Sequence, residues 1–100
     1  MQRDIKFHPI FGLLMRDGVK TCTSRSEHQA DEGDTFNIFG MSFRVTHVIQ
    51  NSLGLIRNGL FYEEGAMSPG HFEEIYRSVG RHRPFDPDKI VWVHHFKRVS

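Results

Sequence analysis

Apolar and polar residues alternate along several short stretches of the chain, a period that is typical of half-buried strands. The stretches that we predict as strands are 4–8, 19–25, 35–39, 42–49 and 90–99. Apolar residues at helical spacing follow Pro9, and they recur after Ser68-Pro69, a pair suited to an N-cap and a first helical residue. Residues 51–60 hold two glycines and their pattern is ambiguous.

Glycines mark the ends of these elements. Gly18 and Gly80 follow the two helical patterns, and Gly18 is expected to take the left-handed conformation that caps a helix. A turn is predicted over 31–34, and a tight hairpin at Gly40-Met41. Strands dominate and the helices are short, so the pattern predicts an α+β fold: a compact barrel or curled sheet with helices packed outside.

Composition is that of an ordinary globular domain. The chain has 100 residues, of which 25% are charged and 38% hydrophobic. No apolar run approaches the ~20 residues that span a bilayer, and the start MQRDIKFH has no signal-peptide core. The single Cys22 excludes an internal disulfide and fits a reducing compartment. We therefore expect a monomeric cytoplasmic protein without a membrane partner.

Charge is balanced overall but unevenly spread. The formal net charge is +1, with basic residues gathered in 1–25 and 77–100 and acidic residues in 27–34 and 63–74. If the two ends of the chain meet, they form one basic face that favours phosphate. The alternative is that these charges are simply solvated.

Four motifs along the chain resemble the ASCH domain family. They are GVKTCTSR at 18–25, Gly33-Asp34, EGAMS at 64–68 followed by Phe72, and VWVHHF at 91–96. The resemblance covers nearly the whole chain. It implies a single ASCH domain over 1–100, with a PUA-like β-barrel of about five or six strands and two or three short helices outside.

The K-T-x-T-x-R pattern is similar to that of a small bacterial branch of the family, which includes amidohydrolases acting on 4-acetylcytidine. The resemblance implies that Lys20, Thr23 and Glu64 carry catalysis. Glu63 is the alternative to Glu64, because only the register against the following glycine separates the two. Ala66 is smaller than the residue the family often has there, which leaves one wall of a base pocket open to question.

Residue chemistry sets conditions on such a site. A threonine hydroxyl needs a nearby base, and a lysine serves only if burial or a positive neighbour such as Arg25 lowers its pKa. Glu64 would orient Lys20 or shuttle a proton, although its charge raises the lysine pKa. In a regular strand Lys20 and Thr23 face opposite sides. They converge only through a bulge, or if Lys20 lies in the turn after Gly18; otherwise this is a structural strand with a solvated lysine.

Further residues are candidates for binding a substrate or RNA: Thr21, Arg25, Arg81 and Arg83. The loop from Arg81 through His82 to Phe85 has two guanidinium groups for phosphate, and Phe85 or Trp92 offers a ring for stacking. The alternatives are a solvated loop anchored by Phe85 and a Trp92 packed in the core.

Metal chemistry is not expected. His94 and His95 are neighbours on a strand and face opposite sides, and the other five histidines share no ligand spacing. We expect no metal and no cofactor. Cys22 is expected to be a small buried residue rather than a nucleophile.

The sequence therefore predicts a small amidohydrolase acting on an acylated pyrimidine nucleoside, of the 4-acetylcytidine type. A non-catalytic module that binds RNA or a nucleotide through Lys20 and Arg25 is the alternative, and a ribonuclease is a third. The expected partner is a modified nucleoside or RNA.

Overall fold

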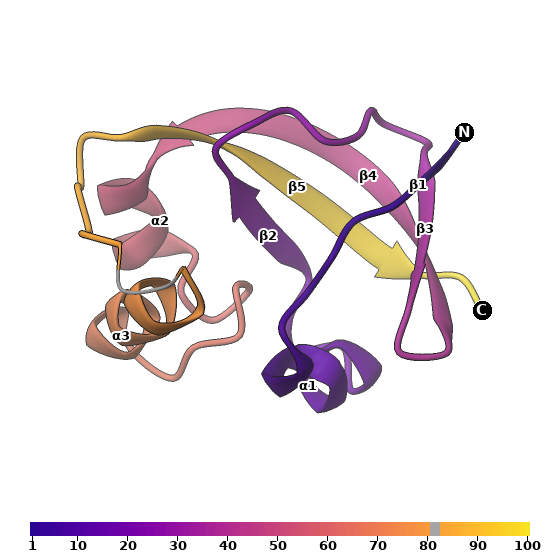
Figure 1. Cartoon of the computed structure of the whole chain (residues 1–100), viewed down its shortest axis with the longest axis horizontal. Coiled ribbons are helices and arrows are strands. Elements are labelled where there is room, and N and C mark those ends of the chain that lie inside the picture. The colour runs from indigo at the N-terminus through magenta and orange to yellow at the C-terminus, as the bar shows by residue number, and fades with distance from the viewer. Residues whose placement is uncertain (81–82) are drawn as a thin grey trace.

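The fold is described from a computed structural model of the chain, which covers residues 1–80 and 83–100 (Figure 1). The elements in chain order are β1 (Gln2–Arg3), the 3-10 helix η1 (Pro9–Phe11), α1 (Gly12–Arg16), β2 (Cys22–Arg25), β3 (Thr35–Ile38), β4 (Met41–Ser52), α2 (Leu53–Gly59), α3 (Pro69–Val79) and β5 (Ile90–Arg98).

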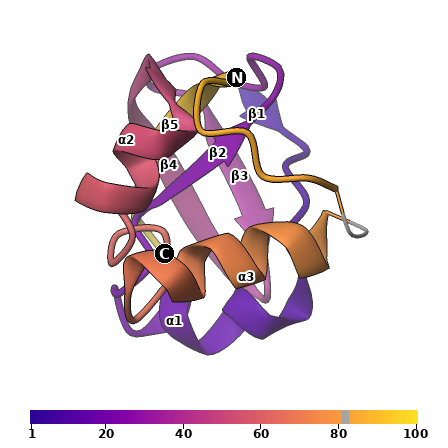
Figure 2. The ribbon, with the colours of Figure 1, turned by 90° about the vertical axis from the view of Figure 1, so that its left-hand side faces the viewer.

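The five strands form one mixed sheet in the order β1-β3-β4-β5-β2. Every pair is antiparallel except β1 with β3. The long strands β4 and β5 curve over α1, α2 and α3, as Figures 1 and 2 show from two sides. The predicted α+β class with outer helices is confirmed. Within the described residues the curled sheet stays open, with β1 and β2 as its edges.

The core has two parts on either side of the sheet's curve. The first is built on stacked and edge-to-face rings of Phe36, Phe43 and Phe96, whose centroids lie 5.3–5.4 Å apart. The second joins α2 and α3 to β5 through Leu53, Ile56, Phe72, Tyr76, Val91 and Val93. Residues of this second part, among them Phe72 and Tyr76, also line the candidate site.

The predicted helix boundaries are largely confirmed. Helical structure begins at Pro9, and the side chain of Ser68 caps α3 by accepting the His71 N–H at 3.1 Å. Gly18 is left-handed, with φ +71°, and α3 ends at Gly80. The ambiguous residues 51–60 contain α2, which begins after Ser52 because the Ser52 hydroxyl accepts the Leu55 N–H. None of the helices in 1–80 and 83–100 combines the length and apolar character needed to cross a membrane.

Two predicted strands are wrong in extent. Residues 4–8 are not a strand; only Gln2–Arg3 pairs, and the Lys6 carbonyl is instead bound by the Arg25 side chain at 2.7 Å. Similarly, β2 begins at Cys22 rather than at residue 19. The backbone N–H groups of Val19 and Lys20 donate to the Leu14 carbonyl, so these two residues belong to the turn after α1.

The hairpin turn between β3 and β4 is also displaced by one residue. Its central residues are Phe39 and Gly40, with φ of +55° and +74°, rather than Gly40-Met41. Two left-handed residues are what a two-residue hairpin turn requires, and they match the twist of the flanking strands.

Candidate functional site

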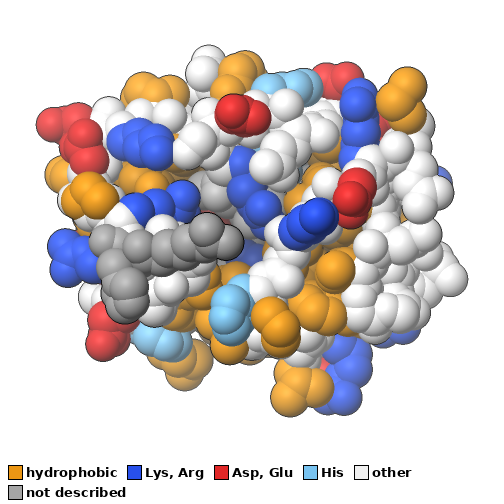
Figure 3. Space-filling model, viewed as in Figure 1, with side chains coloured by type: hydrophobic (Ala, Val, Ile, Leu, Met, Phe, Trp, Pro, Cys, Tyr) orange, Lys and Arg blue, Asp and Glu red, His pale blue; other side chains and the backbone are white. Residues whose placement is uncertain are grey.

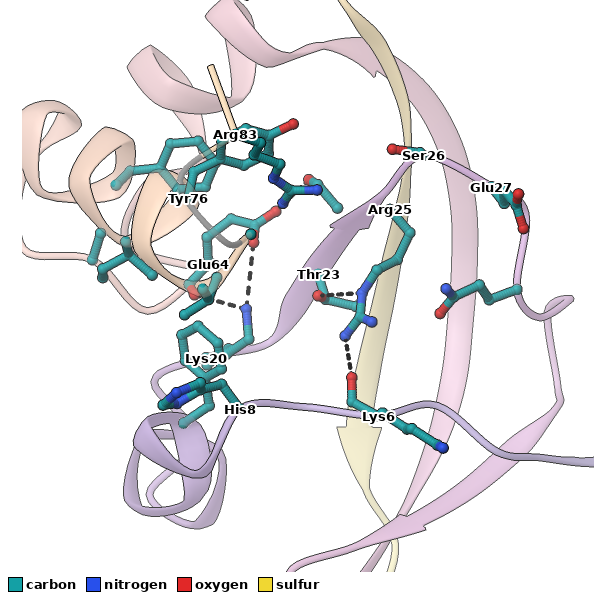
Figure 4. Close-up of a pocket in the computed structure, with 18 residues that line it drawn as sticks. Lys6, His8, Lys20, Thr23, Arg25, Ser26, Glu27, Glu64, Tyr76 and Arg83 are labelled. Carbon is teal, nitrogen blue, oxygen red and sulfur yellow. Dashed lines mark hydrogen bonds and ion pairs between the residues drawn. The ribbon is translucent and has the colours of Figure 1, made fainter. Parts of the chain in front are cut away.

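A cavity of about 410 Å³ lies between the edge strand β2, helix α3 and the segment that leads into η1 (Figure 4). Its wall on the β2 side is polar, with Thr23, Ser24 and Arg25. The opposite wall on α3 is apolar, with Phe72, Ile75, Tyr76 and Val79. Because β2 is an edge strand, residues of both its faces reach the cavity.

Lys20 lies at the base of this cavity, in the loop between Gly18 and β2. Its side chain is 2% exposed. Its Nζ donates to the carbonyl oxygens of Cys22 and Glu64, each at 2.8 Å, and to Glu64 Oε1 at 3.3 Å. Three acceptors use all three N–H bonds of an ammonium group. Burial lowers the Lys20 pKa, and the Glu64 charge opposes that shift.

Glu64 is held at both of its carboxylate oxygens. Oε1 faces Lys20, and Oε2 accepts a hydrogen bond from the Ser24 hydroxyl. The neighbouring Gly65 has φ +102°, and a Cβ there would lie 3.2 Å from Leu14 Cδ1 and 3.5 Å from Lys20 Cβ. Glycine therefore lets the chain turn Glu64 toward Lys20. The adjacent Glu63 has a different role: its carbonyl accepts the N–H groups of Thr21 and Cys22.

Thr23 and Arg25 form a second group on the other face of β2. Arg25 Nε donates to Thr23 Oγ1 at 3.1 Å, and its guanidinium lies 4.8 Å from the centre of the Phe7 ring. Burial lowers the Arg25 pKa. Strand alternation explains the division, because Thr23 and Arg25 point one way while Ser24 points toward Glu64.

The structure places the other predicted binding residues differently. Arg83 lines the cavity and stacks on Tyr76, with 3.6 Å from its Cζ to the ring centre. Thr21 lies outside the cavity lining of the described chain, and its backbone joins Glu63 and Phe96. Arg81 and His82 lie outside the described residues.

Ser24 and the α3 wall are the parts of the site that sequence reasoning missed. Ser24 lies within the 18–25 motif, two residues from Cys22 on the same strand face, and that alternation was its only signal. Phe72 and Tyr76 were expected to be core residues of α3, and they are 5% and 6% exposed. Their rings also line the cavity, which periodicity alone does not reveal. Ala66 lines it as well.

Cys22 is buried as predicted, Phe85 follows the alternative of a loop anchor, and Trp92 is not the packed core residue of its alternative. Cys22 is fully buried, and burial raises its thiol pKa far above the ordinary value. Phe85 packs against Tyr76 with 5.6 Å between ring centres, which anchors the loop to the core. Trp92 is only half-buried and meets the ring of His28 at 4.8 Å.

The two adjacent histidines on β5 face opposite sides of the sheet. His94 is buried and its Nε2 accepts the Gln29 N–H at 3.0 Å, whereas His95 stacks on His47 at 4.1 Å. Burial lowers the pKa of both rings. Across 1–80 and 83–100, no three His, Cys, Asp or Glu side chains gather closely enough to hold a metal ion.

The similarity of this chain to known proteins is found in its structure. No family model matches the sequence. The search of curated proteins finds no significant match either.

Solved structures match over nearly the full chain. An ASCH domain from Lactobacillus crispatus has a TM-score of 0.77 at 14% identity, with 97% of this chain and 79% of that chain covered. A Pyrococcus furiosus protein solved by NMR has a TM-score of 0.69 at 16% identity, with 100% and 99% covered. A protein from Enterococcus faecalis has a TM-score of 0.66 at 22% identity, with 90% and 67% covered. At these identities the likeness establishes the fold alone: this chain has the fold seen in the Lactobacillus crispatus ASCH domain.

Proposed function

We propose that the protein hydrolyses the exocyclic amide of an acylated pyrimidine nucleoside, of the 4-acetylcytidine type. The observation that carries this proposal is the buried ion pair of Lys20 and Glu64 at the base of an open cavity. Withdrawing two charges from water is costly, and a pair kept at a cavity floor is a common feature of working sites.

The shape of the cavity supports a planar aromatic ligand. Its volume of about 410 Å³ lies within the range of small-molecule sites. A base fits between the apolar side chains of α3 and the polar edge of β2, where hydroxyl and guanidinium groups meet its hydrogen-bonding atoms. The acyl group then points toward Lys20 and Glu64.

The hydrogen bonds of Lys20 support an electrostatic role for it rather than that of the base. A neutral amine has two N–H bonds and would leave one of its three acceptors without a donor. Lys20 is therefore charged, and its contact with Oε1 holds Glu64 in place. This makes Glu64 the proton acceptor and Thr23 the nucleophile.

The proposed reaction needs only these side chains and one water molecule. Thr23 Oγ1 attacks the acyl carbon as its proton passes to Glu64, and the positive charge of Lys20 stabilises the negative charge on the oxygen. Glu64 returns the proton to the amine nitrogen as the C–N bond breaks. Water then attacks the ester, loses a proton through Glu64 to Thr23, and releases the carboxylic acid. Thr23 bonds to Arg25 in the free protein, and such relays often close only with substrate bound.

The test is to incubate the purified protein with 4-acetylcytidine and follow cytidine by chromatography. Thr23→Val should lower turnover by a factor of ~10² or more, because it removes the nucleophile. Thr21→Val is the matched control, since Thr21 lies outside the cavity lining. Absence of turnover by the parent protein would overturn the proposal, and full activity of Thr23→Val would overturn the mechanism.

Binding without catalysis is the second candidate. The specific observation that favours it is that Lys20 already has a full set of hydrogen bonds, as a purely structural ammonium would. Cytidine binding that persists in Thr23→Val, with no turnover by the parent, would support this function instead.

A further inference from the structure

Two arginine side chains face the cavity from opposite sides. Arg25 projects from β2, and Arg83 projects from the segment that follows α3 (Figure 4). Neither forms an ion pair with any acidic side chain in the described part of the chain. Two guanidinium groups turned toward one space repel each other, and Arg83 contributes to lowering the pKa of Arg25. An anion between them would remove that repulsion.

Arg83 is held in position before any ligand arrives. Its Cζ lies 3.6 Å from the centre of the Tyr76 ring, a cation–π contact that fixes the plane of the guanidinium group. Its Nε is buried and has no hydrogen-bond partner among the described residues. A buried donor without a hydrogen-bond partner is rare in folded proteins, and a bound anion would supply the missing acceptor.

Gly80 provides the space that Arg83 occupies. A Cβ built at Gly80 would lie 2.1 Å from Arg83 Nε and 2.5 Å from its Cδ, distances that no real side chain tolerates. A side chain at this position would therefore force the Arg83 side chain to shift from the position it holds against Tyr76. Gly80 therefore ends α3 and also sets the position of the arginine.

Arg25 is equally well fixed, and it keeps unused donors. Its Nε donates to Thr23 Oγ1 and one Nη donates to the Lys6 carbonyl at 2.7 Å. An arginine has five N–H bonds, so three have no acceptor among residues 1–80 and 83–100 and can bind a ligand.

The charge of the cavity favours an anion. Its lining includes four cationic side chains, Lys6, Lys20, Arg25 and Arg83, and two acidic ones, Glu27 and Glu64. Lys20 and Ser24 already bind Glu64 at the base of the cavity. Figure 3 shows Lys and Arg side chains around the hollow in this face of the molecule. The positive excess therefore comes from Lys6, Arg25 and Arg83 rather than from the Lys20–Glu64 pair.

We infer that Arg25 and Arg83 form a phosphate subsite, so that the ligand is a nucleoside monophosphate rather than a free nucleoside. This inference rests on the proposed function, which places the base deeper in the cavity. The ribose phosphate then lies at the mouth, where two planar guanidinium groups bind its oxygens.

Calorimetric titration with cytidine, 5′-CMP and 3′-CMP tests the subsite without relying on turnover. One of the monophosphates should bind at least about tenfold more tightly than cytidine, since charge-assisted hydrogen bonds are the strong ones. The better of the two identifies the ribose position that carries the phosphate. Equal affinity for cytidine and both monophosphates would overturn the inference.

Variants locate the effect. Arg83→Gln should remove most of the preference for the monophosphate over cytidine, and Gly80→Ala should reduce that preference by shifting Arg83. Arg83→Lys should keep only part of the preference, because it retains the charge without the planar group. Arg77→Gln is the control, since Arg77 is exposed on α3 and pairs with Glu73 at 2.8 Å. A preference that survives both Arg83→Gln and Gly80→Ala would contradict the assignment.

A separate arm distinguishes the two proposals. Inorganic phosphate is titrated into labelled protein while the NMR signal of Arg83 Nε–H is followed. A saturable shift together with no hydrolysis of 4-acetylcytidine would support the subsite and overturn the proposed function. Hydrolysis without any shift of Arg83, and without preference for a monophosphate, would support the function and overturn the subsite.

Discussion

Asp34 and Glu64 are both nearly buried carboxylates with a cationic partner, yet their surroundings differ. Asp34 accepts from Arg3 Nε at 2.7 Å and from the Asp31 N–H at 2.8 Å, and it lies 3.2 Å from the terminal amine. All of these groups belong to the sheet edge where β1 meets β3. Glu64 faces a cavity, so its second oxygen and its lysine are within reach of a ligand. The first carboxylate holds the fold together, and we propose that the second takes part in chemistry.

Neutralising each carboxylate should separate these roles most strongly. Glu64→Gln should lower 4-acetylcytidine turnover by about 10²-fold or more, because a carboxamide accepts no proton. Asp34→Asn should leave turnover within a factor of two and lower the unfolding temperature instead. Initial rates and thermal unfolding of both variants check this. An Asp34→Asn variant that loses activity while fully folded would remove the distinction.

Removing the cation from the buried pair tests its energetics. Lys20→Met removes the cation that pairs with the buried Glu64 carboxylate, which should cost about 3–5 kcal/mol of unfolding free energy. The double variant Lys20→Met/Glu64→Leu should recover much of that loss, because no charge stays buried. Urea unfolding measures both, and a double variant no more stable than Lys20→Met would contradict the account.

A glycine stands beside each of the two carboxylates, and the two glycines differ in their surroundings. Gly33 precedes Asp34 with φ +89° and has open space around its α-carbon, whereas Gly65 follows Glu64 with φ +102° and is crowded by Leu14 and Lys20. Gly33→Ala should cost about 1–2 kcal/mol from its backbone conformation alone. Gly65→Ala should cost more, because its Cβ would also press on Leu14 Cδ1 at 3.2 Å, and it should reduce turnover, because Gly65 sets the direction of the neighbouring Glu64. Equal losses from the two, by urea unfolding, would mean that the crowding at Gly65 is unimportant.

Acid should weaken the Asp34 contact by a smaller amount. The Asp31 N–H, followed by Arg3, holds the Asp34 pKa well below its usual range. A depressed carboxyl pKa contributes stability that is fully present above the unfolded pKa of about 3.9 and is lost as the pH falls toward the folded value. Stability should therefore fall below about pH 4, and less so in Asp34→Asn. Unfolding curves between pH 7 and pH 2 measure this, and parallel curves for the two proteins would contradict it.

Local patterns were sufficient to predict most elements of this fold. Ser68-Pro69 and Gly80 bound α3 because capping is decided by neighbouring residues, and β5 follows from its alternation. The predicted strands are wrong where contacts with distant segments of the chain determine the local structure. Residues 4–8 alternate like a strand, but the Lys6 carbonyl is bound by Arg25, nineteen positions along the chain.

Only the part of the site that a local pattern marks could be predicted from the sequence. The 18–25 motif directed attention to Lys20, and the structure places this residue in the turn after Gly18. The contact between Ser24 and Glu64 spans forty positions, and it depends on a left-handed Gly65 that no periodic pattern marks. Arg83 gains its position from Tyr76 and Gly80, which looked like an ordinary helix face and helix end.

The central claim is that the buried Lys20–Glu64 pair is a working site, and two adjacent glutamates provide its most direct test. We would measure kcat/KM for 4-acetylcytidine with Glu64→Gln and Glu63→Gln side by side. The account predicts that Glu63→Gln retains the parent value, while Glu64→Gln falls by about 10²-fold or more. Equal values for the two variants, or no hydrolysis by the parent protein, would contradict it.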